Sequence, residues 1–503
     1  MRVTTAFARV NPEAAKTGGE TSIRKGEIMT NRAVLFPLVL VCSLIPVLPS
    51  AQIPVAAGAK ETVRHTVLAT SGSAAPAGGN YVTLFRVALN ARGQIAFDTS
   101  LGGPSTTGVF LTDGRTTSTI ALGGNPDPTA ANFAFVNNPF VTSRGDVVFD
   151  ANFSGTFRAD GNMAGPLVRN GDPAPGGGTL TPLSHATNRR GTIAYRALVS
   201  GAVATTGIFR TDGEQTVAIA RDDGVAPTGG TFTFFADPAI NTRGQVTFVA
   251  EMTGGAADFA ILRGDGASLT PIFVANQIAP GGATFQDFSD PLINTHGQVA
   301  AVALLTNGPD AGLFVGDGRD AAAIALDGQP APSGGSYSLC CAVPLTLNDR
   351  AEVAFHTGLT GGSSNRGIFR GNGQQTTVIA LTGTNAPGTT GTFASFGDIK
   401  LGNDGRVGFI GTLTMGVGGV DLSNNMGIWV GRSEADLQLV VRTGQVIDGK
   451  VLTRLPTGLG QFEMNERGVV WIGSFPSRAT SVVFSRIRED HADVDDRDSN
   501  DRQ

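Results

Sequence analysis

The 503-residue sequence predicts an all-β protein, a β-propeller of eight four-stranded blades that the N-terminal strand closes into a ring. Two observations carry this prediction. A turn motif of the form Asn-x-x-Gly recurs at intervals of roughly 50 residues, and each copy except the last contains enough short apolar runs for four strands. The last copy lacks its fourth strand, and a matching segment stands at the opposite end of the chain.

The turn motif has a local physical explanation. Asn favours the first position of a type I turn, where its side chain bonds back to the main chain, and Gly favours the fourth. The Asn or its replacement stands at Asn90, Thr142, Asn188, Asn241, Asn294, Asn348, Gly402 and Asn465. The Gly or its replacement stands at Gly93, Gly145, Gly191, Gly244, Gly297, Ala351, Gly405 and Gly468. The motif therefore predicts a hairpin turn at one fixed place in each of eight repeats.

Each repeat supplies strands in a fixed order, here named a to d. The motif joins strands a and b, and in strand b the side chains alternate, so that Val246, Phe248 and Ala250 point to one side. Strands c and d are joined by Asp-Gly or Asn-Gly, as in "GIFRTDGEQTVAIA", which is a strong hairpin signal between apolar runs. A stretch rich in Gly and Pro, such as "APTGG", then separates one repeat from the next.

The two ends of the repeat array complement each other. The eighth copy offers only three strands, "QFEMN", "GVVWIG" and "SVVFSRI". The segment "TVRHTVLATSGSAAPAGG", which begins at Thr62, matches the fourth strand and the following Gly- and Pro-rich stretch of the other copies. A ring in which residues 62–68 pair with residues 482–484 explains this and leaves no bare edge at the chain ends. A seven-bladed or split arrangement is the alternative.

The repeat resembles a known group of proteins. "NARGQIAF" at 90–97 and "NDRAEVAF" at 348–355 are similar to the consensus NxxGxxAF of bacterial exported tandem-repeat proteins, which often carry a variable surface anchor. The resemblance extends over about residues 62–487 and implies an exported or surface repeat protein of unknown activity. This chain has a charged tail where such an anchor would stand, so we expect free secretion.

The N-terminal region predicts export. Arg32, the apolar run at 33–48 and the small residue Ala51 have the order of a signal peptide. Residues 1–51 are therefore predicted to be a leader and signal peptide, with Met29 as an alternative start. No other segment is long and apolar enough to cross a bilayer. We expect a secreted protein, extracellular or periplasmic, without a membrane span after signal removal.

Charge and cysteine content narrow the expected partners. Residues 52–487 are the predicted propeller, and residues 488–503 a predicted acidic, disordered tail. The formal net charge is −5, and because the tail is acidic the remaining chain is close to neutral without a basic stripe, so nucleic acid is not an expected partner. Cys42 falls in the leader. A disulfide between the neighbours Cys340 and Cys341 would be strained, so we predict two buried thiols, with a redox-active pair as the alternative.

The predicted working surface is the face with unequal loops. In a propeller the a–b and c–d turns share one face, and the b–c and d–a connections share the other. The b–c loops range from the minimal "DANFSGTF" in the second copy to "IGTLTMGVGGVDLSNNMG" in the seventh. Because variable loops on a rigid scaffold often bind partners, we predict that binding takes place on the face of the b–c and d–a connections.

A second candidate site lies along the central channel, which strand a lines. Four positions before the motif Asn stand Asp237, Asp290 and Asp398. Ser184 holds the same position in another copy, and His185 follows it. This ring of residues near the channel mouth is a candidate site for a cation or a polar ligand. The alternative is that an Asp before a Pro only shapes the turn that enters the strand.

Other residue types favour a non-catalytic protein. None of the five histidines has a metal-ligand spacing with another, so no metal, cofactor or catalytic residue is predicted. Trp429 and Trp471 occupy strand positions filled elsewhere by apolar residues and are predicted core, not sugar platforms. A calcium loop needs several oxygens at alternating positions, whereas each Asp-Gly turn has one Asp. Turn formation is therefore the predicted role of Asp113, Asp160, Asp212, Asp265 and Asp317.

These observations lead to one functional prediction with two alternatives. We expect a secreted, non-catalytic, monomeric β-propeller that binds an unknown protein or glycan through its variable-loop face. The first alternative is an extracellular enzyme acting on polysaccharide, with carboxylates at the channel mouth. The second is a structural component of the cell surface. A cavity with two carboxylates within about 10 Å would favour the enzyme.

Overall fold

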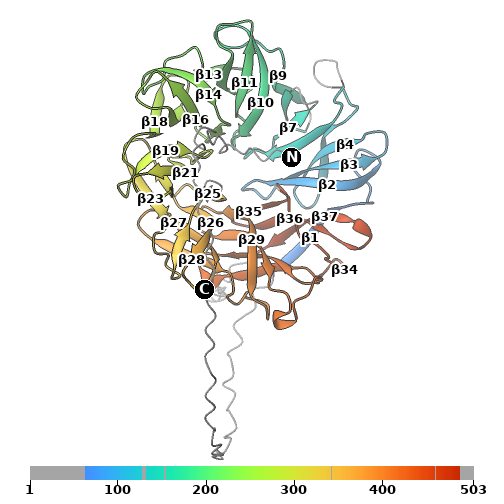
Figure 1. The fold of residues 1–503 in the computed structure, drawn as a ribbon. Helices are drawn as coiled ribbons and strands as arrows, with labels where there is room; N and C mark the ends of the chain where they lie inside the picture. Colours follow the sequence, from blue (N-terminus) through green and yellow to red (C-terminus); the bar gives the residue numbers. More distant parts are fainter. Residues whose placement is uncertain are drawn as a thin grey trace, which may run out of the picture. The chain divides into compact units, whose positions relative to one another are not determined.

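We describe a computed structural model of the chain, in which the described residues are 63–126, 132–151, 155–161, 163–340, 343–458 and 460–487. Its strands form eight blades arranged around a central channel, an eight-bladed β-propeller (Figure 1). This confirms the fold predicted from the repeats and excludes the seven-bladed alternative. The predicted leader, residues 1–51, and the predicted tail, residues 488–503, lie outside the described residues.

Strand a lies innermost in each blade, and the inner strands of neighbouring blades contact each other, as β2 contacts β35. Blade 1 consists of β2 (Asn80–Leu89), β3 (Ile95–Gly102), β4 (Thr107–Thr112) and β5 (Thr117–Leu122). Blade 2 consists of β6 (Val136–Val141), β7 (Val147–Ala151), β8 (Gly155–Ala159) and β9 (Ala164–Arg169). Blade 3 consists of β10 (Thr179–Thr187), β11 (Ile193–Ser200), β12 (Thr206–Thr211) and β13 (Thr216–Arg221).

In the next three blades strand a is broken into two pieces. Blade 4 consists of β14 (Thr231–Phe235) with β15 (Ala239–Ile240), β16 (Val246–Thr253), β17 (Phe259–Gly264) and β18 (Leu269–Val274). Blade 5 consists of β19 (Thr284–Phe288) with β20 (Leu292–Ile293), β21 (Val299–Thr306), β22 (Ala311–Gly316) and β23 (Ala321–Leu326). Blade 6 consists of β24 (Ser336–Ser338) with β25 (Leu345–Leu347), β26 (Val353–Thr360), β27 (Arg366–Gly371) and β28 (Thr376–Leu381).

The last two blades carry additional short elements. Blade 7 consists of β29 (Phe393–Leu401), β30 (Val407–Leu413), β31 (Met426–Gly431) and β32 (Gln438–Arg442). Blade 8 consists of β35 (Phe462–Asn465), β36 (Gly468–Ser474), β37 (Thr480–Arg486) and β1 (Arg64–Thr70). The additional elements are the hairpin β33 (Val446–Ile447) and β34 (Lys450–Val451) and the 3₁₀ turns η1 (Val417–Gly419), η2 (Glu434–Asp436) and η3 (Pro476–Arg478). None of the helical segments in the described ranges is long and apolar enough to cross a membrane.

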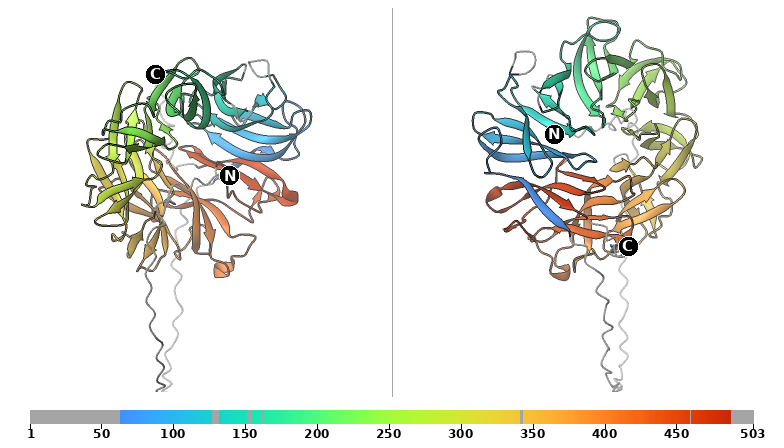
Figure 2. Two further views of the ribbon diagram at one scale, coloured as in Figure 1. Left: turned by 45° about the horizontal axis from the view of Figure 1, so that its top comes forward. Right: turned by 180° about the vertical axis from the view of Figure 1, so that it is seen from behind.

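The N-terminal strand completes the last blade, as the sequence predicts. β1 is the outer strand of blade 8 and pairs antiparallel with β37, with Thr66 opposite Phe484 and Val67 opposite Val483. The blue β1 lies beside the orange-red strands of blade 8 in Figures 1 and 2. Because β37 would otherwise expose its backbone groups at the sheet edge, β1 both covers this edge and joins the two ends of the repeat array.

The motif Asn does two jobs in its turn. In blade 4 the Asn241 side-chain oxygen accepts hydrogen bonds from the backbone N–H groups of Arg243 and Gln245, both at 3.0 Å. Gly244 closes the turn at φ 81°, a left-handed conformation that glycine adopts without steric cost. The amide nitrogen of Asn241 then donates to the carbonyl oxygen of Asn294 in blade 5, at 2.9 Å. One side chain thus shapes its own turn and links its blade to the next.

This inter-blade hydrogen bond recurs around the ring. Among the described residues it joins Asn90 to Thr142, Asn188 to Asn241, Asn241 to Asn294, Asn294 to Asn348, Asn348 to Gly402 and Asn465 to Asn90. Thr142 and Gly402 have no side-chain amide, and other donors act at their interfaces. The Ser143 N–H donates to the Arg189 carbonyl at 2.8 Å, and Arg406 donates to the Glu466 carbonyl at 2.6 Å.

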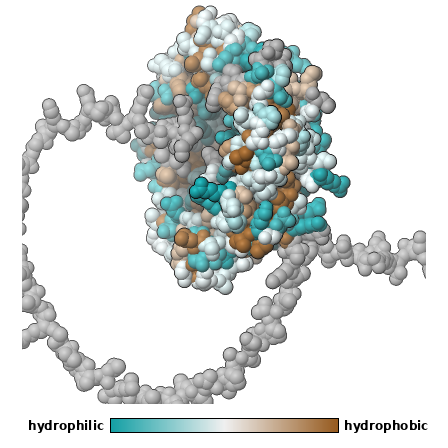
Figure 3. All heavy atoms as spheres, turned by 90° about the vertical axis from the view of Figure 1, so that its right-hand side faces the viewer, coloured by the Kyte–Doolittle hydropathy of each residue, from teal (hydrophilic) through white to brown (hydrophobic). Residues whose placement is uncertain are grey.

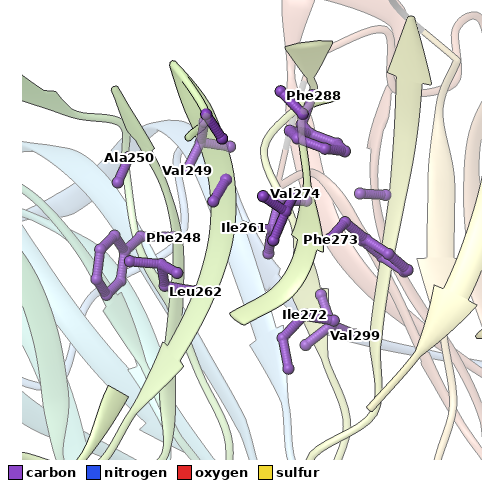
Figure 4. Close-up of a cluster of buried hydrophobic side chains, with 14 of the residues drawn as sticks. Phe248, Val249, Ala250, Ile261, Leu262, Ile272, Phe273, Val274, Phe288 and Val299 are labelled. Atoms are coloured by element: carbon purple, nitrogen blue, oxygen red, sulfur yellow. The ribbon is translucent and has the colours of Figure 1, made fainter. Parts of the chain in front are cut away.

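The hydrophobic core lies between the blades. Figure 4 shows one such interface, where Phe273 of blade 4 lies beside Phe288 and Val299 of blade 5. The ring centroids of Phe273 and Phe288 are 6.3 Å apart. Trp429 and Trp471 are both fully buried, which confirms that they belong to the core. Burial of such side chains between all neighbouring blades is what holds the ring together.

The prediction of two buried thiols is wrong for Cys340, which is exposed. Its position explains the difference. Cys340 lies between β24 and β25, where strand a of blade 6 is interrupted, so it has no place in the regular alternation of buried and exposed strand residues. Cys341 lies outside the described residues.

Candidate functional site

The two faces of the ring differ in their connections. We call the face with the a–b and c–d turns the turn face, and the face with the b–c and d–a connections the loop face. The c–d turns of blades 1 to 6 are alike because an Asp or Asn side chain caps each of them: in blade 3 the Asp212 carboxylate accepts hydrogen bonds from the N–H groups of Glu214 and Gln215, at 3.0 and 2.9 Å. These hydrogen bonds hold the pKa of Asp212 below its usual value. The turn-forming role predicted for the Asp-Gly dipeptides is thereby confirmed.

Most of the large apolar side chains that are exposed lie on the loop-face connections, and a smaller group lies on strands. On the loop-face connections they are Val203, Val225, Ile278, Met415, Val417, Leu422, Val446 and Val451. On inner strands and at the end of one strand b they are Val82, Phe85, Leu183, Leu198 and Phe234. Of the large hydrophobic residues exposed in the described ranges, Met163 alone lies in a turn of the turn face. The loop face therefore carries more exposed large apolar side chains than the turn face.

The predicted channel residues occupy a recurring irregularity of strand a. Asp237 and Asp290 stand in the breaks between β14 and β15 and between β19 and β20, and each precedes a proline that cannot donate to the sheet. Ser184 and Asp398 lie beside register shifts of β10 and β29. The irregularity turns their polar side chains away from the hydrogen-bonded ladder.

The structure brings Ser184, Asp237 and Asp290 into one neighbourhood. The Ser184 hydroxyl donates to the Asp237 carboxylate at 2.6 Å, and Arg196 of blade 3 donates to the same oxygen at 3.1 Å. Burial raises the pKa of Asp290, and the negative charge of Asp237 adds to this effect. The Arg196 guanidinium also lies over the Phe234 ring, 5.7 Å from its centroid.

His185 and Asp398 belong to two other clusters. His185 faces the Asp150 carboxylate at 3.6 Å and lines a cavity of about 220 Å³ between blades 2 and 3. Asp398 lies 3.4 Å from the Lys400 ammonium, which also contacts Glu463 of blade 8 at 3.0 Å. Burial works to lower the pKa of Lys400, but the two carboxylates outweigh it and hold that pKa above its usual value.

The predicted ring is therefore a series of separate polar contacts between blades. Within the described ranges no group of three or more His, Cys, Asp or Glu side chains is arranged to hold a metal ion. Ligand binding at Ser184, His185, Asp237, Asp290 and Asp398 stays a prediction.

Sequence reasoning missed a set of titratable residues on strand b, two of which contact the predicted residues: Arg196 contacts Asp237, and Asp150 faces His185. Asp98, Asp150, Arg196 and His356 each stand eight positions after the motif residue, where Val249, Val302 and Ile410 stand in other blades. Titratable residues at an otherwise apolar strand position were the available signal. Burial raises the pKa of Asp98 to about 6, although its carboxylate accepts hydrogen bonds from the backbone N–H groups of Asn138 and Arg86.

Comparison with known proteins places the chain in a family. A family model described as "Family of unknown function (DUF7453)" matches residues 55–310 and again 167–475. The chain belongs to this family. No curated protein matches this DUF7453 member.

Several solved structures resemble the DUF7453 chain at low identity. A puromycin hydrolase matches at 10% identity with a TM-score of 0.41, over 78% of this chain and 58% of the hydrolase, so the chain spans little more than half of that protein. The Dos1 propeller matches at 9% identity with a TM-score of 0.39, over 84% of this chain and 95% of Dos1. YCF48 bound to the D1 peptide matches at 10% identity with a TM-score of 0.30, over 85% and 95%. These values carry no information about activity.

Proposed function

We propose that the chain is a secreted, non-catalytic β-propeller that binds a protein or glycan partner through its loop face. One observation carries the proposal: of the fourteen exposed large apolar side chains in the described ranges, eight lie on the loop-face connections and only Met163 lies in a turn of the opposite face. A cluster of exposed apolar residues rimmed by polar ones is typical of an interaction surface. Export and kinship with the NxxGxxAF tandem-repeat proteins are part of the proposal, and they rest on the leader-like residues 1–51 and on the repeat motif.

The densest part of the surface surrounds the connections of blade 7. Leu422 is 80% exposed in the b–c loop, and Val446 is 64% exposed in the following hairpin. Arg442, at the end of β32 just before the hairpin, holds the b–c loop beside it by donating to both the main-chain and the side-chain oxygen of Asn424 at 2.5 and 3.0 Å. We name the exposed apolar residues of these two segments, Leu422 and Val446 among them, the blade-7 patch. The rigid ring beneath the patch holds it in place, so binding a partner costs little conformational entropy.

The cavities favour binding over the enzyme alternative. Hydrolysis of a glycosidic bond generally needs two carboxylates on opposite sides of the sugar. Four cavities between described residues each have a single acidic side chain in their wall, namely Asp150, Asp113, Asp212 and Asp349. The Asp349 carboxylate is already held by Thr295 and Asn403, at 2.7 and 2.9 Å.

The proposal is tested by comparing variants in which one exposed apolar residue becomes acidic. Leu422→Asp and Val446→Asp are expected to abolish recovery of the wild-type binding partners from native culture medium, and of any ligand on a glycan array. Met163→Asp, on the turn face, is the matched control and is expected to retain both. Unaltered binding by the two blade-7 variants, with wild-type melting temperatures, would show that the loop face is not the binding surface. Self-assembly of the purified wild-type chain would favour the structural alternative.

A further inference from the structure

The seam between the last and first blades contains a cavity of about 490 Å³ on the turn face. Figure 3 shows this side of the ring, where hydrophilic and apolar surface patches alternate. Five arginines and one aspartate line the cavity, namely Arg64, Arg92, Arg115, Arg467, Arg486 and Asp113. The corresponding cavity between blades 3 and 4 measures about 180 Å³. The lining of this cavity is therefore positively charged, although the formal net charge of the chain is −5.

Two of these arginines stand in an unfavourable position for stability. Arg64 of β1 lies directly opposite Arg486 of β37, so the two side chains project from the same face of the sheet. Like charges directly opposite each other destabilise a strand pair. Asp113 does not compensate for them, because its carboxylate accepts the N–H groups of Arg115 and Thr116, both at 2.8 Å. These turn hydrogen bonds keep the pKa of Asp113 below its usual value.

Arginines at other blade interfaces have a structural role that Arg64, Arg115 and Arg486 lack. Arg210, Arg263 and Arg370 each donate to the carbonyl oxygen of the motif glycine in the following blade. At the seam Arg467 fills this role by donating to the Arg92 carbonyl at 2.8 Å. Among the described residues, the side chains of Arg64, Arg115 and Arg486 have neither a hydrogen-bond nor an ion-pair partner. They are exposed and free to meet a ligand.

The remaining wall of the cavity contains three apolar side chains beside Thr66 and two glycines. Leu68, Ile95 and Phe484 line it between the arginines. Arginine guanidinium groups bind carboxylates through paired hydrogen bonds. Apolar side chains in the same cavity can contact the aliphatic parts of the side chains that carry those carboxylates. Phe484 is the one aromatic residue among the lining residues, so the cavity lacks the row of stacking platforms with which proteins bind single-stranded nucleic acid.

We propose that the seam cavity binds an acidic peptide, a segment with several closely spaced carboxylates. The chain itself contains one such sequence. Residues 488–503, whose first residue follows Arg486 by two positions, include seven acidic residues and three arginines. The ligand can therefore come from this chain or from a partner, and the chemistry of recognition is the same. This site lies on the turn face and does not depend on the loop-face function proposed above.

The test uses the full chain and a fluorescent peptide with the sequence of residues 488–503, followed by fluorescence anisotropy. Arg64→Gln with Arg486→Gln is expected to raise the Kd at least tenfold. The matched control, Arg190→Gln with Arg243→Gln, changes two exposed arginines of the cavity between blades 3 and 4 and is expected to stay within twofold of wild type. Equal loss in both double variants, or no binding by either the wild-type chain or a chain that ends at Ile487, would overturn the proposal.

Three further measurements separate the sources of the ligand and the classes of macromolecule. A chain ending at Ile487 that binds the peptide at least tenfold more tightly identifies residues 488–503 as the resident ligand, whereas equal affinity identifies an acidic segment of a partner. A single-stranded oligonucleotide that binds the wild type more tightly than the peptide would contradict the peptide assignment. Leu422→Asp is expected to leave peptide binding unchanged, so the failure of one proposal does not imply failure of the other.

Thermal stability gives a readout independent of any ligand. Arg64→Gln removes a like-charge pair, so its Tm without peptide is expected to rise above that of wild type. Added peptide is expected to raise the Tm of wild type and to have little effect on the double variant. If Arg64→Gln instead lowers the Tm, the arginine is a structural residue of the seam and the binding role is wrong.

Discussion

At the scale of single residues, one strand-b position holds a titratable side chain in some blades and an apolar one in others. His356 holds this position in blade 6, where it is 9% exposed and its Nε2 atom has no hydrogen-bond partner among the described residues. Its ring lies edge-on to Phe396, with centroids 5.7 Å apart. Burial, with a smaller contribution from Arg366, lowers the pKa of His356 to about 4. Blades 4 and 5 carry Val249 and Val302 in its place.

His356→Val is expected to reduce the sensitivity of the fold to acid. Because the folded-state pKa is below the unfolded value of 6.5, the unfolded chain binds the proton more readily between pH 6.5 and 4. The free energy of unfolding of wild type therefore falls as the pH falls through this window, by about 2–3 kcal/mol at pH 4.5 from this group alone. Urea titrations at pH 7 and pH 4.5 measure the difference, with exposed His296→Gln as control. An identical acid sensitivity of wild type and His356→Val would contradict the assignment.

A second residue shows the cost of departing from the motif. Ala351 replaces the usual glycine in blade 6 and keeps the left-handed backbone, with φ 59°. A left-handed conformation costs a non-glycine residue about 1–2 kcal/mol. The turn still forms because Asn348 accepts the N–H groups of Arg350 and Glu352, both at 3.0 Å, and donates to the next blade. These three hydrogen bonds together keep the turn in its usual shape despite the local strain.

At the scale of elements, the a–b and c–d turns have different hydrogen-bonding requirements, which explains why one kind uses Asn and the other mostly Asp. The c–d turns need only an acceptor oxygen, and Asp supplies it in most blades. The a–b turns need an acceptor for their own N–H groups and a donor for the next blade, and the Asn amide supplies both. A sequence-based assignment of Asn-x-x-Gly as a hairpin turn is correct but accounts for only one of these two requirements.

Asn241→Asp is expected to destabilise the ring by about 1–3 kcal/mol, because the buried Asn294 carbonyl loses its donor and faces a carboxylate oxygen. Asn372→Asp is the matched control. Asn372 caps a c–d turn by accepting the N–H groups of Gln374 and Gln375, which Asp does equally well in other blades, so its effect is expected to stay within about 0.5 kcal/mol. Chemical denaturation of both variants measures the difference. Similar losses would mean that the inter-blade donor adds nothing.

At the scale of the whole molecule, stability depends on closing the ring. β1 supplies the outer strand of blade 8, and the Asn465 amide reaches the Asn90 carbonyl at 2.8 Å across the same seam. Side chains reinforce the pairing, since Thr70 and Ser481 share a hydrogen bond of 2.9 Å. The two ends of the repeat array, more than 400 residues apart, are thereby held in one sheet.

A chain that begins at Ser71 is expected to melt at a lower temperature and to associate with itself, because β37 becomes an open edge strand. A chain that begins at Val63 keeps β1 and is the control. Differential scanning calorimetry and light scattering measure the two effects. If both truncated chains melt alike and stay monomeric, closure by β1 is not what stabilises the ring.

Sequence reasoning reached the candidate site only in part. The spacing of Ser184, Asp237 and Asp290 placed them correctly at equivalent points of strand a, because each stands at the same distance from its turn. The contacts of the predicted residues were not predictable. Arg196 contacts Asp237 from a neighbouring blade, and Asp398 contacts Lys400. Such contacts depend on breaks and register shifts whose geometry no periodicity encodes.

The sequence by itself determined the repeat, the turns, the number of blades and the closing strand. These features depend on short-range physics: an Asn that binds its own backbone, a glycine at positive φ, and side chains that alternate along a strand. Only the tertiary structure decided which distant side chains meet. Arg64 and Arg486 become neighbours because the ring closes, and the apolar residues of the loop face share a surface because the blades are held side by side.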